Sequence, residues 1–146
     1  MTLNCNGKLI DLSTPKVMGI LNVTPDSFYD GGKFKNDKSF LIHAEKLIKE
    51  GADFVDIGAY SSKPGADFVS EKEEINRLIP IVRLIHDNFP QTPISIDSFR
   101  SRVIKASVEV GATMVNDISG GQLDPLMLET VGALGVPYIM MHMEGT

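Results

Sequence analysis

The sequence is poor in cysteine, in positive charge and in long apolar runs, and each shortage excludes a class of protein. Cys5 is the only cysteine among 146 residues, which rules out an internal disulfide and a metal site made of paired cysteines. Lysine and arginine number 14 against 19 aspartates and glutamates, and they form no basic stripe, so we expect no nucleic-acid partner. No apolar run approaches the roughly 20 residues that cross a membrane. The N-terminal stretch MTLNCNGKLIDLS lacks the features of a signal peptide, so we expect a cytoplasmic protein.

What is present is a pattern of short apolar runs that alternate with helical periodicity. Hydrophobic residues make up 42 % and charged residues 23 %, as in a folded globular domain. Ser70 and Glu73 form a capping box before the second helix, and Pro125 is placed as the first residue of the fourth. The pattern predicts strands at 17–21, 53–58, 93–97, 112–117 and 136–142, and helices at 39–49, 71–88, 101–110 and 125–134.

Strands that are apolar on both faces and alternate with helices predict a parallel sheet covered by helices. A doubly wound sheet normally carries a glycine-rich phosphate motif after its first strand, but this chain has NVTPDSFYDGG there and no G-x-G-x-x-G. An eight-stranded α/β barrel fits better, and it takes about 250 residues. We therefore interpret the chain as the front part of a (β/α)8 barrel that covers strands 1–5.

Each predicted strand has a polar group at or near its carboxyl end, where a parallel sheet gathers its functional side chains. The nearest cations are Lys63 and Arg100, and both lie in loops, so we expect these polar groups to meet a ligand. The strand-end groups are Asn22, Asp56, Asp97, Asn116, Asp117 and His142.

The chemistry of these side chains favours a flat, polar ligand. Asp97 with Asn116 combines an acceptor with an amide, a pair that suits the edge of a heterocycle. Asn22 offers a neutral oxygen to a hard cation such as Mg2+. The loops at 24–32 and 61–66 are candidate lids, and Phe28 offers an apolar face to an aromatic second substrate. Asp56 is either a hydrogen-bonded structural carboxylate or a ligand contact, and no arrangement of residues indicates a covalent nucleophile.

Four stretches, GILNVTPDSFYDGG, DIGAYSSKPGA, ISIDSFR and VNDISGG, occur in this order at the predicted strand ends. In this they closely resemble dihydropteroate synthase. The resemblance extends over all 146 residues and implies a single domain that is the N-terminal part of a pterin-binding (β/α)8 barrel. Residues 1–14 resemble the family's hairpin at the barrel floor, and residues 15–146 its βα units.

The resemblance implies a transferase of folate biosynthesis that condenses 7,8-dihydropterin-6-ylmethyl diphosphate with 4-aminobenzoate. Diphosphate leaves with the help of Mg2+, and the arylamine traps a pterin methylene cation in an SN1-like reaction. Asn22 would contact Mg2+ and diphosphate, and Asp97 would stabilise the cation. The remaining implied contacts are Asp97, Asn116, Ile118 and Met141 around the pterin, Ser62 at the pterin diphosphate, and Phe28, Lys63 and Pro64 around 4-aminobenzoate. Sulfonamides, which mimic 4-aminobenzoate, would inhibit it.

Two departures from the family pattern leave other functions open. Lys63 stands where the family usually has arginine, and it keeps the charge but loses the bidentate fork. Ser62 replaces a threonine, which is a milder change. The family's second half, with further pterin-binding groups and a homodimer interface, is absent from this chain, so we expect the 146 residues alone to be inactive. The alternatives are a pterin-binding but inactive homologue or fragment, and a pterin-dependent methyltransferase on the same barrel.

Overall fold

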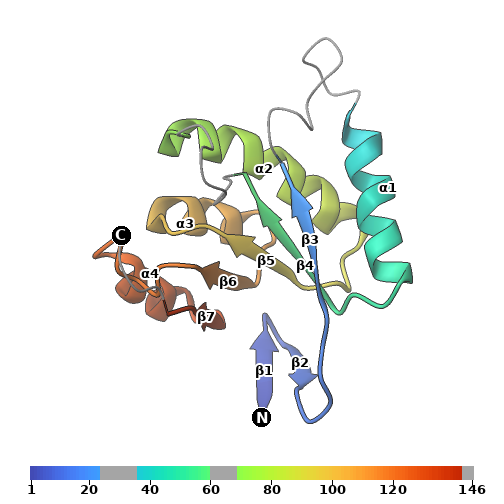
Figure 1. Cartoon of the computed structure of the whole chain (residues 1–146), viewed down its shortest axis with the longest axis horizontal. Coiled ribbons are helices and arrows are strands. Elements are labelled where there is room, and N and C mark those ends of the chain that lie inside the picture. The colour runs from blue at the N-terminus through green and yellow to red at the C-terminus, as the bar shows by residue number, and fades with distance from the viewer. Residues whose placement is uncertain (24–35, 60–68, 143–146) are drawn as a thin grey trace.

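The computed structural model describes residues 1–23, 36–59 and 69–142. The predicted lid loops, with Phe28, Ser62, Lys63 and Pro64, lie outside these ranges. Eleven elements follow one another in the described part (Figure 1): β1 (Thr2–Cys5), β2 (Lys8–Asp11), β3 (Met18–Asn22), α1 (Asn36–Lys49), β4 (Phe54–Gly58), α2 (Glu71–Asn88), β5 (Ile94–Asp97), α3 (Ser101–Glu109), β6 (Met114–Asp117), α4 (Met127–Leu134) and β7 (Tyr138–Met140).

Strands β3 to β7 form one parallel sheet whose spatial order is the order of the chain. A doubly wound sheet reverses its strand order at a switch point, whereas a barrel adds each new strand to the same side of the last. The unbroken order β3-β4-β5-β6-β7 is therefore that of a barrel arc, as the sequence predicted.

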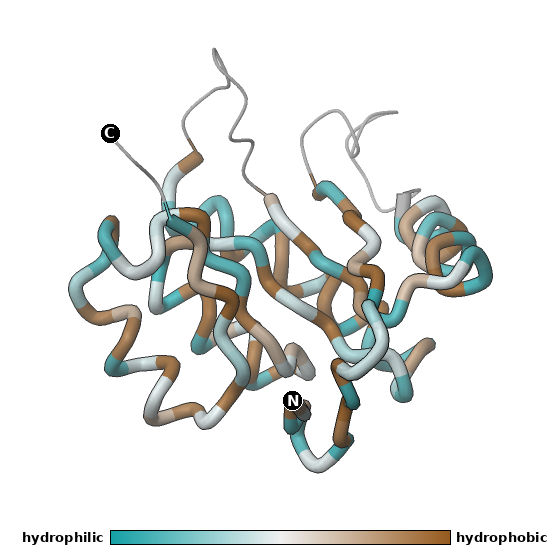
Figure 2. The backbone as a smooth tube through the Cα atoms, turned by 60° about the horizontal axis from the view of Figure 1, so that its bottom comes forward, coloured by the Kyte–Doolittle hydropathy of each residue, from teal (hydrophilic) through white to brown (hydrophobic). Residues whose placement is uncertain are grey.

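One face of this sheet packs against the helices and forms the main core. In β3 to β6 every second residue lies on that face, and examples that are fully buried are Leu21, Ile57, Ile96 and Val115. Apolar side chains of the helices complete the cluster, among them Ala44, Leu78, Ile85, Ile104, Met127 and Val131. The hydropathy-coloured tube shows apolar residues recurring throughout the described part of the chain (Figure 2).

The opposite, inner face of the sheet is more polar than the sequence predicted. Ile20, Asp56, Ser95 and Met114 lie side by side in register across four strands. Ile20 is 58 % exposed, while Asp56 and Ser95 are buried polar residues. The expectation of strands that are apolar on both faces is therefore wrong for this face, because its carboxyl-terminal half carries polar groups in place of core residues.

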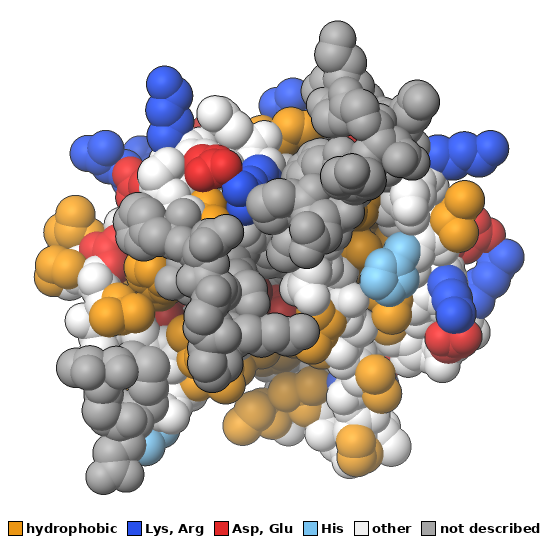
Figure 3. All heavy atoms as spheres, turned by 45° about the horizontal axis from the view of Figure 1, so that its top comes forward, with side chains coloured by type: hydrophobic (Ala, Val, Ile, Leu, Met, Phe, Trp, Pro, Cys, Tyr) orange, Lys and Arg blue, Asp and Glu red, His pale blue; other side chains and the backbone are white. Residues whose placement is uncertain are grey.

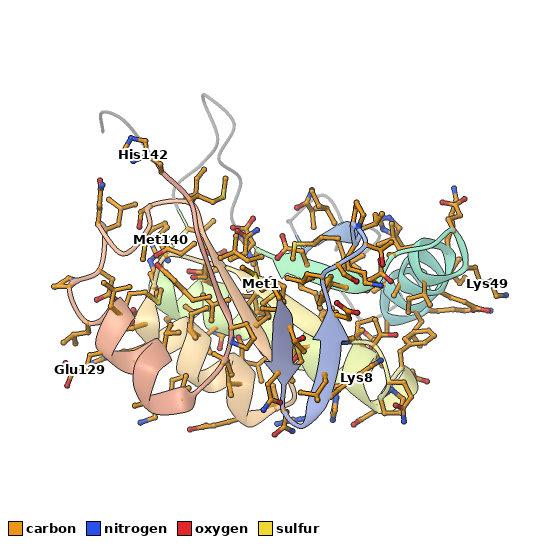
Figure 4. All side chains as sticks on the ribbon, turned by 90° about the horizontal axis from the view of Figure 1, so that it is seen from below. Met1, Lys8, Lys49, Glu129, Met140 and His142 are labelled. Carbon is orange, nitrogen blue, oxygen red and sulfur yellow. The ribbon has the colours of Figure 1, made fainter. Side chains whose placement is uncertain are left out.

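The hairpin of β1 and β2 covers the amino-terminal end of the inner face (Figure 4). A second, small core forms there from Cys5 and Ile10 of the hairpin and Phe54 and Met114 of the sheet. The side chain of Lys8 donates a hydrogen bond to the carbonyl of Gln91, which ties the hairpin to the turn before β5. The hairpin thus closes the end of the sheet that lies away from the strand-end polar groups.

Local hydrogen bonds determine where helices α2 and α4 begin. Helix α2 begins as predicted, with the Glu73 N–H donating to Ser70 Oγ at 3.1 Å. The predicted start of α4 at Pro125 is wrong, because Asp124 Oδ1 accepts from Leu126 N and Asp124 O accepts from Met127 N. These bonds form a turn over Pro125, and the helix starts at Met127. Strand β7 is also shorter than the predicted 136–142, so His142 lies beyond it.

Candidate ligand site at the carboxyl ends of the strands

The candidate site is a row of inner-face residues at the carboxyl ends of β3 to β6. Asn22 pairs in register with Gly58, and Asp97 pairs with Asn116. A Cβ atom built on Gly58 would lie 3.1 Å from Asp97 Cβ and 3.2 Å from Asp97 Oδ2, so glycine leaves the space that the carboxylate fills. The row therefore brings together three of the predicted site residues from three strands.

The charge around this row is mostly negative. On the face towards which the strands point, most Lys and Arg side chains project from the periphery (Figure 3). Asp97 is partly buried, and no residue in the described ranges donates a hydrogen bond to its carboxylate. Burial, followed by the charges of Asp56, Glu74 and Asp117, raises its pKa from 3.8 to about 7. A ligand that donates hydrogen bonds or carries developing positive charge would stabilise the ionised carboxylate.

Asp56 lies one row deeper than Asp97 and contacts Asn116. The Asn116 amide donates from Nδ2 to Asp56 Oδ2 at 3.3 Å. Burial raises the pKa of Asp56, while Ser95 of β5 and Asn116 of β6 act in the opposite direction. Asp56 Oδ1 and Asn116 Oδ1 are buried and make no hydrogen bond within the described part of the chain. Asp56 thus has one oxygen hydrogen-bonded to Asn116 and one buried oxygen without a partner among the described residues.

Asp117 does not belong to the row, although it follows Asn116 directly. Consecutive residues of a strand point to opposite faces, so Asp117 turns towards the helices and is fully buried. Its Oδ1 accepts from the backbone and hydroxyl of Ser119, and its Oδ2 accepts from Gly121 N and from the Tyr138 hydroxyl at 2.6 Å. The prediction that it converges with the other strand-end groups is wrong, because it organises the loop after β6 instead.

A buried ion pair beneath the strand ends was missed by sequence reasoning. Glu74 of α2 is 1 % exposed and accepts from Arg100 Nη1 at 2.9 Å. Burial raises the pKa of Glu74, while Ser98 and Arg100 oppose the rise. Arg77, one turn further along α2, donates to the carbonyl of Ala59 at 3.3 Å. A glutamate at a core-facing position, four residues before Leu78, was the signal in the sequence.

Three other predicted residues, Ile118, Met141 and His142, lie just after the ends of β6 and β7. Ile118 is half-buried just after β6, and Met141 is 42 % exposed just after β7. The Met141 N–H donates to the Asp117 carbonyl at 3.3 Å, so both lie beside the same loop. His142, labelled in Figure 4, is exposed and lies past the end of β7. The pterin contacts of Ile118 and Met141 stay predictions.

A metal ion has one candidate ligand among the predicted residues. Asn22 is exposed at the end of β3 and offers an amide oxygen. Within residues 1–23, 36–59 and 69–142 there is no group of three His, Cys, Asp or Glu side chains that could hold a metal ion. Since Mg2+ keeps several waters and shares substrate phosphates, a single neutral oxygen is compatible with it.

Comparison with known proteins now identifies the family. The family model described as pterin binding enzyme matches residues 18–146. The chain belongs to this family. It is 44 % identical over 145 residues to the dihydropteroate synthase of Haemophilus influenzae, an alignment that covers 99 % of this chain and 52 % of that protein. It is 50 % identical over 129 residues to the folic acid synthesis protein fol1 of Pneumocystis carinii, covering 88 % of this chain and 17 % of the relative.

Solved structures of the family have the same fold. The Xanthomonas albilineans dihydropteroate synthase with 4-aminobenzoic acid gives a TM-score of 0.89 at 41 % identity, covering 99 % of this chain and 53 % of that one. The Yersinia pestis enzyme in complex with a sulfonamide drug gives 0.87 at 44 % identity, covering 100 % and 52 %. The resemblance and the fold prediction are thus confirmed, and the chain is a partial α/β barrel. It spans about half the length of the dihydropteroate synthases that it matches.

One further finding concerns membranes. Among the helices of the described residues, none combines the length and the apolar character that a membrane crossing requires.

Proposed function

We propose that the protein containing this chain is a dihydropteroate synthase. It joins 7,8-dihydropterin-6-ylmethyl diphosphate to 4-aminobenzoate and releases diphosphate. The observation that carries the proposal is the pair Asp97 and Asn116, in register at the strand ends of a pterin-binding barrel. Relatives named dihydropteroate synthase that match nearly the whole chain support the same reaction.

In this proposal Asp97 and Asn116 hold the polar edge of the pterin, with Ile118 and Met141 against its ring. The Asp97 carboxylate also stabilises the positive charge that develops on the pterin methylene as diphosphate leaves. A fixed carboxylate in a partly buried pocket suits that task, because it needs little reorganisation as the charge forms. Burial, followed by the charges of Asp56, Glu74 and Asp117, raises the pKa of this carboxyl group to about 7.

Asn22 is the residue proposed to hold Mg2+, through its amide oxygen. The ion, when bound, would neutralise charge on the departing diphosphate. Ser62 would bind the pterin diphosphate, and Phe28, Lys63 and Pro64 would form the 4-aminobenzoate pocket. These four residues lie outside the described ranges, so their roles rest on the resemblance. Sulfonamide inhibition and a homodimeric assembly of the complete protein belong to the same proposal.

The test is release of diphosphate by the complete protein, supplied with Mg2+, the pterin diphosphate and 4-aminobenzoate. We expect release that depends on both organic substrates, together with a dihydropteroate product identified by mass. The proposal is wrong if pterin binds but no diphosphate appears under these conditions. Preferential binding of methyltetrahydrofolate would instead favour the methyltransferase.

A further inference from the structure

The buried carboxylate of Asp56 has no role in the reaction proposed above. It is 3 % exposed and lies on the inner face of β4, in register with Ser95. Its Oδ2 accepts the hydrogen bond from Asn116 Nδ2, from a residue 60 positions away in the chain. Because β5 lies between β4 and β6, this bond crosses the sheet surface at the foot of the candidate site.

The chemistry of the pair determines which way the Asn116 amide is turned. A side-chain amide has a donor end and an acceptor end of nearly the same shape, so the space it fills does not distinguish the two orientations. An ionised carboxylate only accepts, so Asp56 favours the orientation that turns Nδ2 towards it. Asn116 Oδ1 is then the end turned away from Asp56, and it is buried without a hydrogen-bond partner in the described part of the chain.

An unpartnered buried carbonyl is costly, and a ligand N–H is the group that would satisfy it. The neighbouring Asp97 carboxylate is also an acceptor in register with Asn116. The two strand ends together therefore present acceptors, with the second Nδ2 proton as their remaining donor. A ligand edge with N–H donors fits this pattern, and the same edge with its donors removed would not.

We propose that Asp56 is a positioning residue that orients the Asn116 amide, so that Asn116 Oδ1 and Asp97 accept hydrogen bonds from the pterin edge. This inference rests on the proposed function for the identity of the ligand. Asp56 itself touches no reacting atom. Its contribution is to exclude the flipped amide, which would present two donors where the ligand also donates.

The experiment measures binding of the pterin diphosphate by isothermal titration calorimetry, with the complete protein and without 4-aminobenzoate. Four forms are compared, namely wild type, D56N, N116D and the double variant D56N/N116D. We expect D56N to weaken binding about tenfold, the effect of one lost charge-assisted hydrogen bond. N116D should weaken it more, since two carboxylates then face each other. The double variant restores a donor and an acceptor to the pair, and we expect it to bind better than N116D.

D124N is the matched control, because it makes the same chemical change at a carboxylate away from the inner face. Asp124 accepts from the backbone N–H groups of Ser101 and Leu126, which lead into α3 and α4. We expect D124N to lower stability and to leave pterin affinity within about twofold of wild type. A nonspecific effect of losing a carboxylate would instead weaken binding in both variants.

Each result decides the inference. D56N binding within about twofold of wild type overturns it, as does a double variant no better than N116D. If D56N does not fold, the comparison of N116D with the double variant decides alone. A wild-type protein that binds pterin but releases no diphosphate refutes the proposed function and leaves the orientation test intact. A wild-type protein that binds no pterin overturns both.

Discussion

Replacing Asp97 by asparagine should stabilise the fold at neutral and alkaline pH. The pKa of this carboxyl group is raised from 3.8 to about 7. Burial is the largest cause, and among the neighbouring charges Asp56 contributes most. The folded protein therefore keeps a proton that the unfolded chain has already lost between these two values. As a result, the contribution of Asp97 to the unfolding free energy is largest below pH 3.8. It falls as the pH rises towards 7 and is constant above that.

The size of the effect follows from the same values. A rise from 3.8 to about 7 corresponds to about 4 kcal/mol, at about 1.4 kcal/mol for each pKa unit. Asp97 is partly exposed, and water on its open side screens the charge, so we expect D97N to gain about 2 kcal/mol at pH 8. Near pH 4 the gain should almost vanish, because both forms then fold with a neutral side chain.

The assay is urea unfolding of the complete protein and its D97N variant at pH values from 4 to 8. The quantity of interest is the difference in unfolding free energy between the two forms, which cancels the titration of other groups. The reasoning is refuted if this difference does not grow with pH, or if D97N is the less stable form at pH 8. The same variant should lose diphosphate release by about two orders of magnitude, since its neutral amide cannot stabilise a cation.

Three further predictions concern the surroundings of the site. G58A should weaken pterin binding about tenfold by calorimetry, because the added Cβ would press on Asp97, and unchanged binding would contradict this. The unfolding free energy measured in urea should change by less than about 1.5 kcal/mol. R100M should cost about 3–5 kcal/mol in unfolding free energy at pH 7, since it leaves Glu74 buried without its cation, and R100M/E74Q should recover part of that loss. S70A should lower the melting temperature, corresponding to about 1 kcal/mol, through loss of the α2 cap; S70D, which keeps an acceptor, is the control.

The ion pair beneath the strand ends bears on how the site keeps its shape. Glu74 and Arg100 connect the helix layer to the loop that follows Asp97, and Arg77 contacts the carbonyl at the exit of β4. Such a pair is weak support for stability by itself, since desolvation offsets much of its attraction. Its position indicates a role in the shape of the site, because Arg100 and Arg77 both connect α2 to strand ends that carry or flank the candidate site.

The sequence by itself determined the elements, their order and the family. Periodicity located every helix and strand of the barrel arc, because burial of one face repeats at a spacing that the residues record directly. Four strand-end stretches identified the family, and they placed Asn22, Asp97 and Asn116 at the site, since parallel strands all end at one edge of the sheet. The predicted start of α4 was wrong, because a side-chain acceptor on Asp124 forms a turn over Pro125 and the helix begins after it.

Only the tertiary structure decided which strand-end groups face the ligand and which face the helices. Asn116 and Asp117 look equivalent in sequence, but strand alternation sends one to the inner face and the other into a network with Ser119 and Tyr138. The bond between Asp56 and Asn116 joins residues 60 positions apart across an intervening strand, so no local pattern announces it. The raised pKa of Asp97 has the same origin, because it comes from burial and from charges on strands and a helix that only the folded chain brings together.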